Sequence, residues 1–213
     1  MREKLGTRKS QILKFLLNRG KASVAEIQRA SAIPRSSLNH HLTWLRKHGY
    51  ITQARKGKII ENSVHPLYAQ KLRKKLKIKA PKLLISGYTY DPGKPDITTL
   101  ELLQRALKFL EEKGIKIDKT IAFTTPIAQK KIRETSYIRG DEEVAMEYEI
   151  YSNRIKEIEK RMKEKIEENI PASDIIIDLT PLSKLFSVVA LSLAKEYGSR
   201  AFYHAGDRVV WLN

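Results

Sequence analysis

The 213-residue sequence contains no cysteine, and it has no long apolar run. The first absence excludes disulfide bonds, thiol nucleophiles and cysteine-ligated zinc. A membrane-spanning helix needs roughly 18 or more apolar residues, so we expect no membrane contact and a cytoplasmic location. The five histidines show no ligand spacing together with carboxylates, and we therefore expect no metal site.

Glycine-rich nucleotide motifs are also missing. The sequence contains neither a Gly-x-Gly-x-x-Gly fingerprint nor a Walker sequence. Binding of dinucleotides or triphosphates is therefore not indicated, and we expect no cofactor.

Acidic residues are scarce in one part of the chain only. Residues 1–80 contain 20 Lys and Arg but 3 Asp and Glu, whereas residues 81–213 contain 21 of each class. The whole net charge of +17 thus belongs to the first 80 residues. This asymmetry predicts two domains, residues 1–80 and 81–213, of which the first is suited to a polyanion.

The basic domain has start and stop signals for three short helices. Thr7 can cap a first helix, and Gly20 stands where it would stop. Residues 23–26 form a capping box that opens a second helix. Pro34 suits the first turn of a third helix, with Gly49 as its stop. This arrangement predicts a helix-turn-helix.

The third helix has one apolar face and one polar face. Leu38, Leu42 and Leu45 recur at i, i+4 and i+7 and form an apolar stripe. Polar side chains that can meet base edges in a major groove lie opposite or beside it. The predicted DNA contacts of this helix are Arg35, Ser36, Ser37, Asn39, His40, Thr43 and Lys47.

Two β-prone runs follow around a Lys-Gly turn and predict a hairpin. Its tip carries Arg55, Lys56 and Lys58, which suit phosphate or the minor groove. The stretch IPRSSLNHHLTWLRKHGYI resembles the recognition helix and wing entry of archaeal and bacterial winged helix-turn-helix regulators. The resemblance covers about residues 7–65 and implies double-stranded DNA as partner. Winged helices also serve as protein-interaction modules, which is the alternative.

Residues 66–79 predict an amphipathic helix that ends the basic domain. Its basic side chains could touch phosphates, or the helix could be a solvated connector. Pro81 marks the boundary.

The neutral domain alternates strands and helices, which predicts a Rossmann-like α/β domain with a mostly parallel sheet. Together with the α+β winged helix-turn-helix, this makes the chain α/β overall. The final strands should form an antiparallel hairpin around Gly206 and Asp207. The predicted strands are residues 83–90, 120–123, 174–180, 201–204 and 208–212, and the predicted helices are 100–110, 126–133, 141–169 and 182–197.

Ligands of such sheets lie at the carboxyl ends of the strands. The corresponding loops are residues 86–92, 124–126 and 178–184. In the last of them Thr180 can cap the next helix, and Lys184 lies on its first turn. A helix N-terminus with hydroxyls and a lysine can hold an anion, although ordinary capping is the simpler interpretation.

The stretch IIIDLTPLSKLFSVVALSLA resembles the strand–loop–helix motif of CARF (CRISPR-associated Rossmann fold) domains, and LLISGYTYDP resembles their first strand and ligand loop. The resemblance implies a homodimer that binds a cyclic oligoadenylate between protomers. Pro181 and Leu182 stand where the family has glycines, and in this family the winged helix mostly follows the CARF domain. The implied ligand-binding residues are Ser86, Gly87, Tyr88, Thr125, Thr180, Ser183 and Lys184.

Two alternatives remain open for this domain. Some CARF proteins resemble ring nucleases, and by position Ser86 and Lys184 would then orient the sugar and stabilise phosphate charge. Otherwise the domain only dimerises.

The charge-dense stretch 141–169 predicts a long helix with an apolar face. This helix could contact a dimer mate, cover the ligand cleft, or lie on its own sheet. Asp141, Glu142 and Glu143 are interpreted as helix N-terminal charge rather than as a metal site.

Overall fold

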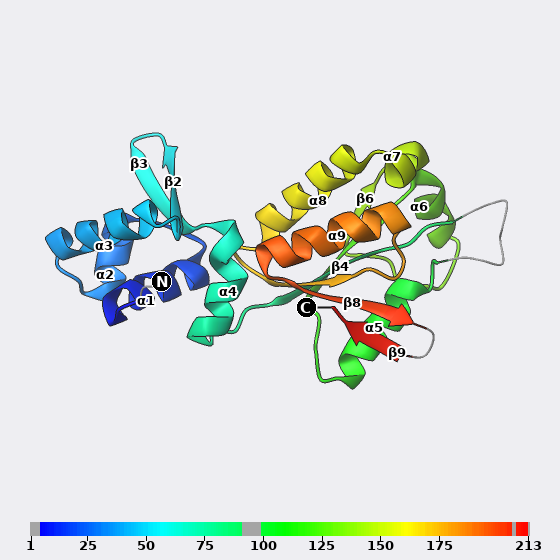
Figure 1. Ribbon diagram of the computed structural model, residues 1–213, viewed down its shortest axis with the longest axis horizontal. Coiled ribbons are helices and arrows are strands. Elements are labelled where there is room, and N and C mark those ends of the chain that lie inside the picture. The colour runs from blue at the N-terminus through cyan, green and yellow to red at the C-terminus, as the bar shows by residue number, and fades with distance from the viewer. Residues whose placement is uncertain (1–4, 91–98, 206–207, 213) are drawn as a thin grey trace. The chain divides into compact units, whose positions relative to one another are not determined.

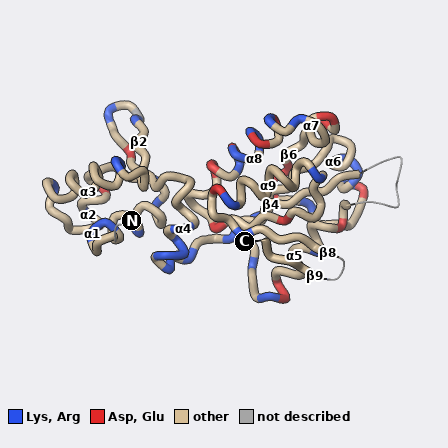
Figure 2. Tube along the Cα trace, in the orientation of Figure 1, with Lys and Arg blue, Asp and Glu red and all other residues tan. Residues whose placement is uncertain are grey.

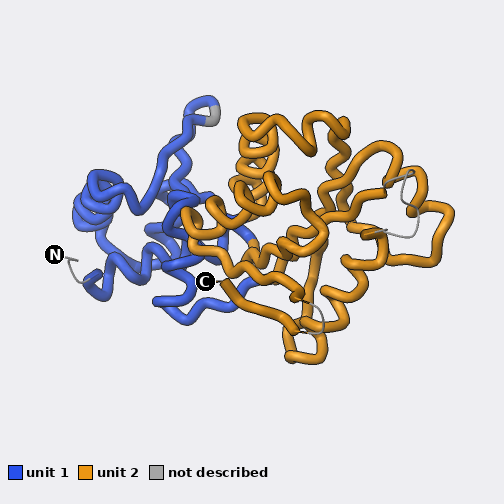
Figure 3. Tube along the Cα trace, turned by 45° about the vertical axis from the view of Figure 1, so that its right-hand side comes forward, with its two compact units in different colours: residues 1–80, 170–172 blue, residues 81–169, 173–213 orange. Residues whose placement is uncertain are grey.

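The computed structural model describes residues 5–90, 99–205 and 208–212, without the side chain of Lys56. The chain divides into two compact units (Figures 1 and 3). Unit 1 consists of residues 1–80 and 170–172, and unit 2 of residues 81–169 and 173–213. Unit 1 therefore includes a short segment, Ile170–Ala172, that lies far from the rest of it in the sequence.

Unit 1 is a winged helix-turn-helix. Three helices precede the hairpin β2 (Ile51–Lys56) and β3 (Ile59–Val64). The antiparallel sheet has the order β1-β3-β2, in which the three-residue strand β1 (Lys21–Ser23) was not predicted. The helices are α1 (Thr7–Arg19), α2 (Val24–Ser31), α3 (Arg35–Lys47) and, after the hairpin, α4 (Pro66–Leu76).

Local signals set the helix boundaries of unit 1. The capping box is present: Glu26 N–H donates to Ser23 Oγ, and Ser23 N–H donates to Glu26 Oε2 at 2.8 Å. Gly20 ends α1 with φ +86°, a conformation that favours glycine. The expected cap by Thr7 is wrong, because Gly6 holds the N-cap position and makes no side-chain bond.

The apolar stripes of the first three helices meet in one small core. Ile12, Leu16, Ile27, Leu38 and Leu45 are all fully or nearly fully buried. The predicted stripe of α3 is thus the side that packs inward, which leaves its opposite side to solvent.

Arg73 on α4 is a buried cation of this unit. Its guanidinium Nη1 donates to the carbonyl oxygen of Ile170 at 2.6 Å, and Nη2 donates to that of Pro171. These carbonyls supply the polar partners that a buried charge requires. The segment 170–172 is therefore an integral part of unit 1.

Unit 2 contains a six-stranded sheet of order β6-β5-β4-β7-β8-β9. All neighbouring strands are parallel except β8 and β9, which form the predicted antiparallel hairpin. Its expected turn at Gly206 and Asp207 lies outside the described residues. The strands are β4 (Lys82–Gly87), β5 (Lys119–Thr124), β6 (Glu142–Ala145), β7 (Asp174–Asp178), β8 (Arg200–Ala205) and β9 (Arg208–Trp211).

Helices pack against both faces of this sheet. Leu84, Ala122 and Phe202 share one buried cluster with residues of α5 and α6. On the other face Phe123 packs against Phe186 of α9, with ring centroids 5.1 Å apart. Successive strand residues point to opposite faces, so both faces of a buried strand are apolar. The helices are α5 (Leu102–Glu112), α6 (Pro126–Ile132), α7 (Tyr148–Asn153), α8 (Ile155–Asn169) and α9 (Lys184–Tyr197).

The expected long helix over residues 141–169 is wrong. This stretch forms β6, α7 and α8 instead. Asp141 accepts hydrogen bonds from the backbone N–H and hydroxyl of Thr120, both at 2.7 Å, and Glu142 aligns with Ile121 in the sheet. The acidic triplet therefore leads into a strand rather than a helix. The apolar stripe of α8 is buried within unit 2.

Candidate nucleic-acid interface and the carboxyl edge of the parallel sheet

Helix α3 presents a polar surface to solvent. The stripe Leu38, Leu42 and Leu45 is buried, and Ser37 is half-buried. The helix carries no acidic residue along its length. The remaining predicted DNA contacts of this helix are all exposed: Arg35, Ser36, Asn39, His40, Thr43 and Lys47.

The wing adds cations beside this helix. Arg55 and Lys58 are exposed at its tip, where Gly57 adopts φ +61°. The Nε–H of Arg55 donates to the Gly57 carbonyl at 3.1 Å, which fixes the guanidinium near the turn. The predicted contact through the Lys56 side chain lies outside the described part. Figure 2 shows basic positions at the wing tip and on α4.

A chain of hydrogen bonds joins the wing to the end of α3. Arg46 Nη1 donates to Gln53 Oε1 at 2.6 Å, and Gln53 Nε2 donates to Asn62 Oδ1 at 2.9 Å. The buried Asn62 donates in turn to the carbonyl of Ala22 on β1. No sequence pattern predicts this chain of bonds, since its members lie up to 40 residues apart.

An aromatic stack supports the other side of α3. The Nζ of Lys9 on α1 lies 3.4 Å from the centroid of the Trp44 ring, within cation–π range. The rings of Trp44 and His48 stack at 3.9 Å, and Trp44 is also stacked with Tyr50. Trp44 is half-buried, so its ring links α1 and the wing entry to the helix.

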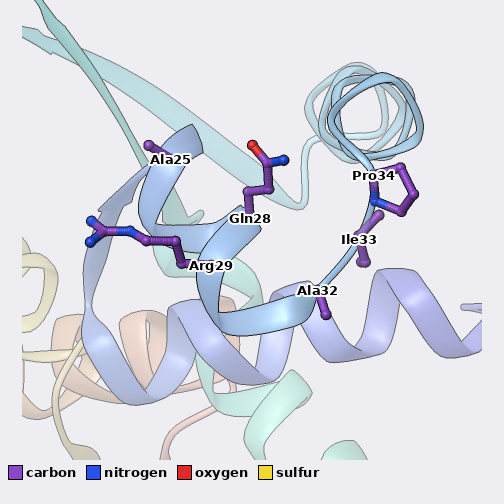
Figure 4. A pocket seen from close by; sticks show the side chains of 6 residues that line it. All are labelled: Ala25, Gln28, Arg29, Ala32, Ile33 and Pro34. Carbon is purple, nitrogen blue, oxygen red and sulfur yellow. The ribbon is translucent and has the colours of Figure 1, made fainter.

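An open hollow of about 480 Å³ lies next to the turn between α2 and α3 (Figure 4). Gln28 and Arg29 carry its polar side chains, and Ile33 and Pro34 line it near the start of α3. Its remaining lining is Ala25 and Ala32.

In unit 2, side chains from two adjacent strands meet at the carboxyl edge. Ser86 at the end of β4 donates to Asp178 Oδ2 of β7 at 3.0 Å. The backbone N–H and hydroxyl of Thr180 donate to Asp178 Oδ1, and Thr180 Oγ1 accepts from the backbone N–H of His204. Burial raises the pKa of Asp178. The strand order reverses between β4 and β7, so this cluster lies at the switch point of the sheet.

Tyr88 belongs to a second cluster at this edge. Its hydroxyl donates to Glu143 of β6, which also accepts from Gln129 Nε2 at 2.8 Å. Burial and the neighbouring carboxylate raise the pKa of Tyr88. Gly87 lies close to its neighbours, because a Cβ there would come within 2.5 Å of the Phe123 carbonyl oxygen.

The other predicted ligand residues serve as helix caps or lie near a helix start. Thr125 is buried and accepts from the Ala128 N–H at the start of α6. Ser183 accepts from the Phe186 N–H and caps α9, so the expected cap by Thr180 is wrong. Lys184 is the first residue of α9 and is exposed. Ser86 and Thr180 thus both donate hydrogen bonds to Asp178, whereas Tyr88 donates to Glu143.

Neither a metal cluster nor a membrane helix is found where the structure describes the chain. Its described residues contain no group of three or more His, Cys, Asp or Glu that could hold a metal ion. Within the same ranges, every helix is too short or too polar to cross a bilayer.

Comparison with known proteins finds a family match within the N-terminal unit. Residues 7–53 match the family described as "Bacterial regulatory protein, arsR family". No curated protein sequence matches the chain. Residues 7–53 are therefore similar to the ArsR family, within a unit that folds as a winged helix-turn-helix, and an α/β domain with a mostly parallel sheet follows.

Solved structures show more distant similarity. Reduced HlyU from Vibrio cholerae N16961 has 22% identity and a TM-score of 0.30 over 34% of this chain and 73% of that one. The homodimeric winged helix-turn-helix domain of Mb0332 from Mycobacterium bovis has 20% identity and a TM-score of 0.29, covering 34% and 64%. Csm6 from Enterococcus italicus, bound to cyclic hexa-2'-fluoro-hexa-dAMP, has 12% identity and a TM-score of 0.42, covering 60% and 33%.

Proposed function

We propose that this chain is a sequence-specific, DNA-binding transcriptional regulator that acts as a homodimer. The observation that carries this proposal is the division of α3 into a buried leucine stripe and an exposed polar surface without acidic residues. Such a helix fits the major groove, where base edges are read by hydrogen bonds. The match of residues 7–53 to bacterial regulatory proteins supports the same function.

The charge of residues 1–80 suits this role. Their excess of 17 positive charges attracts the phosphate backbone irrespective of sequence. The exposed Arg55 and Lys58 supply phosphate or minor-groove contacts beside the helix. Exposed lysines of α4, such as Lys74 and Lys75, extend the basic surface.

DNA selection followed by salt titration tests the proposal. The protein should enrich one site from a random duplex pool, and a palindromic site would reflect a dimer. A protein with 6–10 phosphate contacts loses about 10³–10⁵-fold in affinity between roughly 50 and 200 mM salt. If no duplex is enriched and the affinity for DNA does not change with salt, the DNA-binding proposal is wrong. The alternative, a winged helix that binds another protein, would then replace it.

We further propose that unit 2 is a CARF-like domain that dimerises and binds a small anion, with cyclic oligoadenylate as the ligand implied by the resemblance. The reversal of strand order at β4 and β7 supports a site at this edge. Lys184 supports an anionic ligand, because it is exposed on the first turn of α9. This function would make the protein a CRISPR-associated regulator.

Exposed apolar side chains support dimerisation through α8 and α9. Val188 is 63% exposed and Ile155 is 46% exposed. Both line a hollow of about 170 Å³, together with Val189 and Leu193. A second copy that covers this surface would remove apolar area from water. Sedimentation of the wild-type protein and of Val188→Asp checks this, and a monomeric wild-type protein would contradict it.

The ring-nuclease alternative requires Ser86 to reach the sugar of a bound ligand. Ser86 is fully buried, and its hydroxyl already donates to Asp178. Ligand sensing without cleavage therefore fits this geometry better. Incubation with cyclic tetra-adenylate decides between them, since intact ligand excludes the nuclease and linear products establish it.

A further inference from the structure

The wing carries two large apolar side chains that lie in solvent. Ile59 is 56% exposed and Ile60 is 49% exposed, at the start of β3. Further along the same strand, Asn62 and Val64 are buried against the body of unit 1. The hairpin thus extends past the core that covers its base (Figure 1). Adjacent strand residues point to opposite sides, so the two isoleucines present apolar surface on both sides of the ribbon.

Cations surround this apolar tip. Arg55 is the cross-strand partner of Ile60, and Lys58 directly precedes Ile59. No acidic residue occurs between Arg55 and Ile60, and Glu61 at the next position is half-buried. An apolar ridge bordered by positive charge matches a DNA minor groove, where phosphates line the rims and sugars and base edges form the floor.

The base of the wing is braced against the recognition helix. Arg46 of α3 bonds Gln53 of β2, and Gln53 bonds the buried Asn62 of β3. Because both strands of the hairpin are held at its base, the tip can push against DNA without the hairpin giving way. A mobile hairpin would bend instead of the DNA. Arg46 is therefore a positioning residue for the wing.

We propose that Ile59 and Ile60 form an apolar wedge that enters the DNA minor groove and bends the duplex. This inference rests on the proposed DNA binding. Proteins that insert apolar side chains between base steps bend DNA by roughly 20–90°. Part of the operator preference would then come from flexible pyrimidine–purine steps under the wing, at positions that α3 does not read.

Energy transfer between the ends of a labelled duplex tests the wedge. The duplex carries the site that the full-length protein selects, and binding is measured in parallel by anisotropy. The wild-type protein should raise the transfer efficiency on binding. The double variant Ile59→Ser/Ile60→Ser should bind with affinity lowered at most about tenfold while leaving transfer near that of the free duplex, because phosphate contacts dominate affinity.

Matched variants separate apolar contact from charge and from folding. Ile59→Val/Ile60→Val keeps apolar surface and should still bend DNA. Lys58→Ala should weaken binding and reduce the salt slope by about 1, with the bend retained in the complex. Arg46→Ala should reduce the bend while the melting temperature of unit 1, which holds the wing, stays close to that of the wild-type protein.

Several outcomes overturn the wedge. A bound but straight duplex, or an equal bend with the serine variant, excludes it while leaving DNA binding intact. Failure to bind any duplex removes both proposals. Loss of anionic-vesicle binding in the serine variant, with DNA bending unchanged, would assign the isoleucines to a membrane surface. A change of oligomeric mass with unchanged bending would assign them to a protein interface.

Discussion

The Ser86 hydroxyl donates to Asp178 Oδ2 at 3.0 Å, although 92 residues separate the two in the sequence. The bond joins β4 to β7 at the point where strand order reverses. Asp178 is fully buried, and Thr180 supplies its other two donors. At the carboxyl edge of the sheet, the buried Asp178 carboxyl group is therefore held by hydrogen bonds from Ser86 and Thr180.

Ser86→Ala should destabilise unit 2. The substitution removes one of the donors to a buried carboxyl group and should cost about 1–3 kcal/mol of unfolding free energy. Urea unfolding followed by circular dichroism measures this. Ser136→Ala, at an exposed serine of unit 2 away from the proposed dimer surface, is the matched control and should change stability by less than about 0.5 kcal/mol. Equal effects of both variants would contradict a structural role for the Ser86–Asp178 bond.

Stability should fall at mildly acidic pH through His41. Burial, then the neighbouring His40, lowers the pKa of His41 in the folded protein. The unfolded chain therefore takes up a proton first as the pH falls below about 6.5, and stability is lost from there down through the lower folded pKa. His41→Gln should flatten this dependence in melting experiments. His40→Gln removes one of the weaker causes of the lowered pKa, beside Lys9 and Arg8, and should alter the pH dependence less.

Different mutations should affect the recognition of bases and the attraction to phosphates. Arg35→Ala and His40→Ala should each reduce discrimination against a mismatched site by about 1–3 kcal/mol. Lys58→Ala should instead weaken all sequences to a similar degree, because a phosphate contact carries no base information. Competition binding with specific and random duplexes measures both. Uniform weakening by all three variants would show that α3 does not read bases.

Ligand binding by unit 2 should depend on Lys184. A ligand at about 100 times its dissociation constant stabilises the folded state by about 2.7 kcal/mol, so cyclic tetra-adenylate should raise the melting temperature. Lys184→Ala should abolish that shift, whereas Lys195→Ala near the other end of α9 should retain it. A shift that survives Lys184→Ala would remove this lysine from the site.

Sequence patterns predicted the elements that depend on local signals. Ser23 and Glu26 lie three residues apart, and their reciprocal capping is fully local. The stripe Leu38, Leu42 and Leu45 needs only helical periodicity. The run around Ile175–Ile177 is apolar on both faces, as a buried parallel strand requires.

Elements set by distant partners escaped prediction. Strand β6 is rich in acidic residues, and only its pairing with β5 and the bonds between Asp141 and Thr120 make it a strand. The two lysines that contact Glu142, Lys165 and Lys119, lower the pKa of its carboxyl group and stabilise it there. The Arg46–Gln53–Asn62 chain likewise has no sequence pattern, since it forms only after the hairpin folds onto β1.

Unit 1 is not one continuous stretch of the chain, because the three residues Ile170–Ala172 belong to it. This limits the transfer of unit 1 to another protein by gene recombination. A fragment that ends at Ala80 keeps the Arg73 guanidinium but loses the Ile170 and Pro171 carbonyls that receive it. Such a fragment would lose two hydrogen-bond acceptors of the Arg73 guanidinium. Recombination with a single crossover after residue 80 would therefore transfer unit 1 without the segment Ile170–Ala172 that completes it.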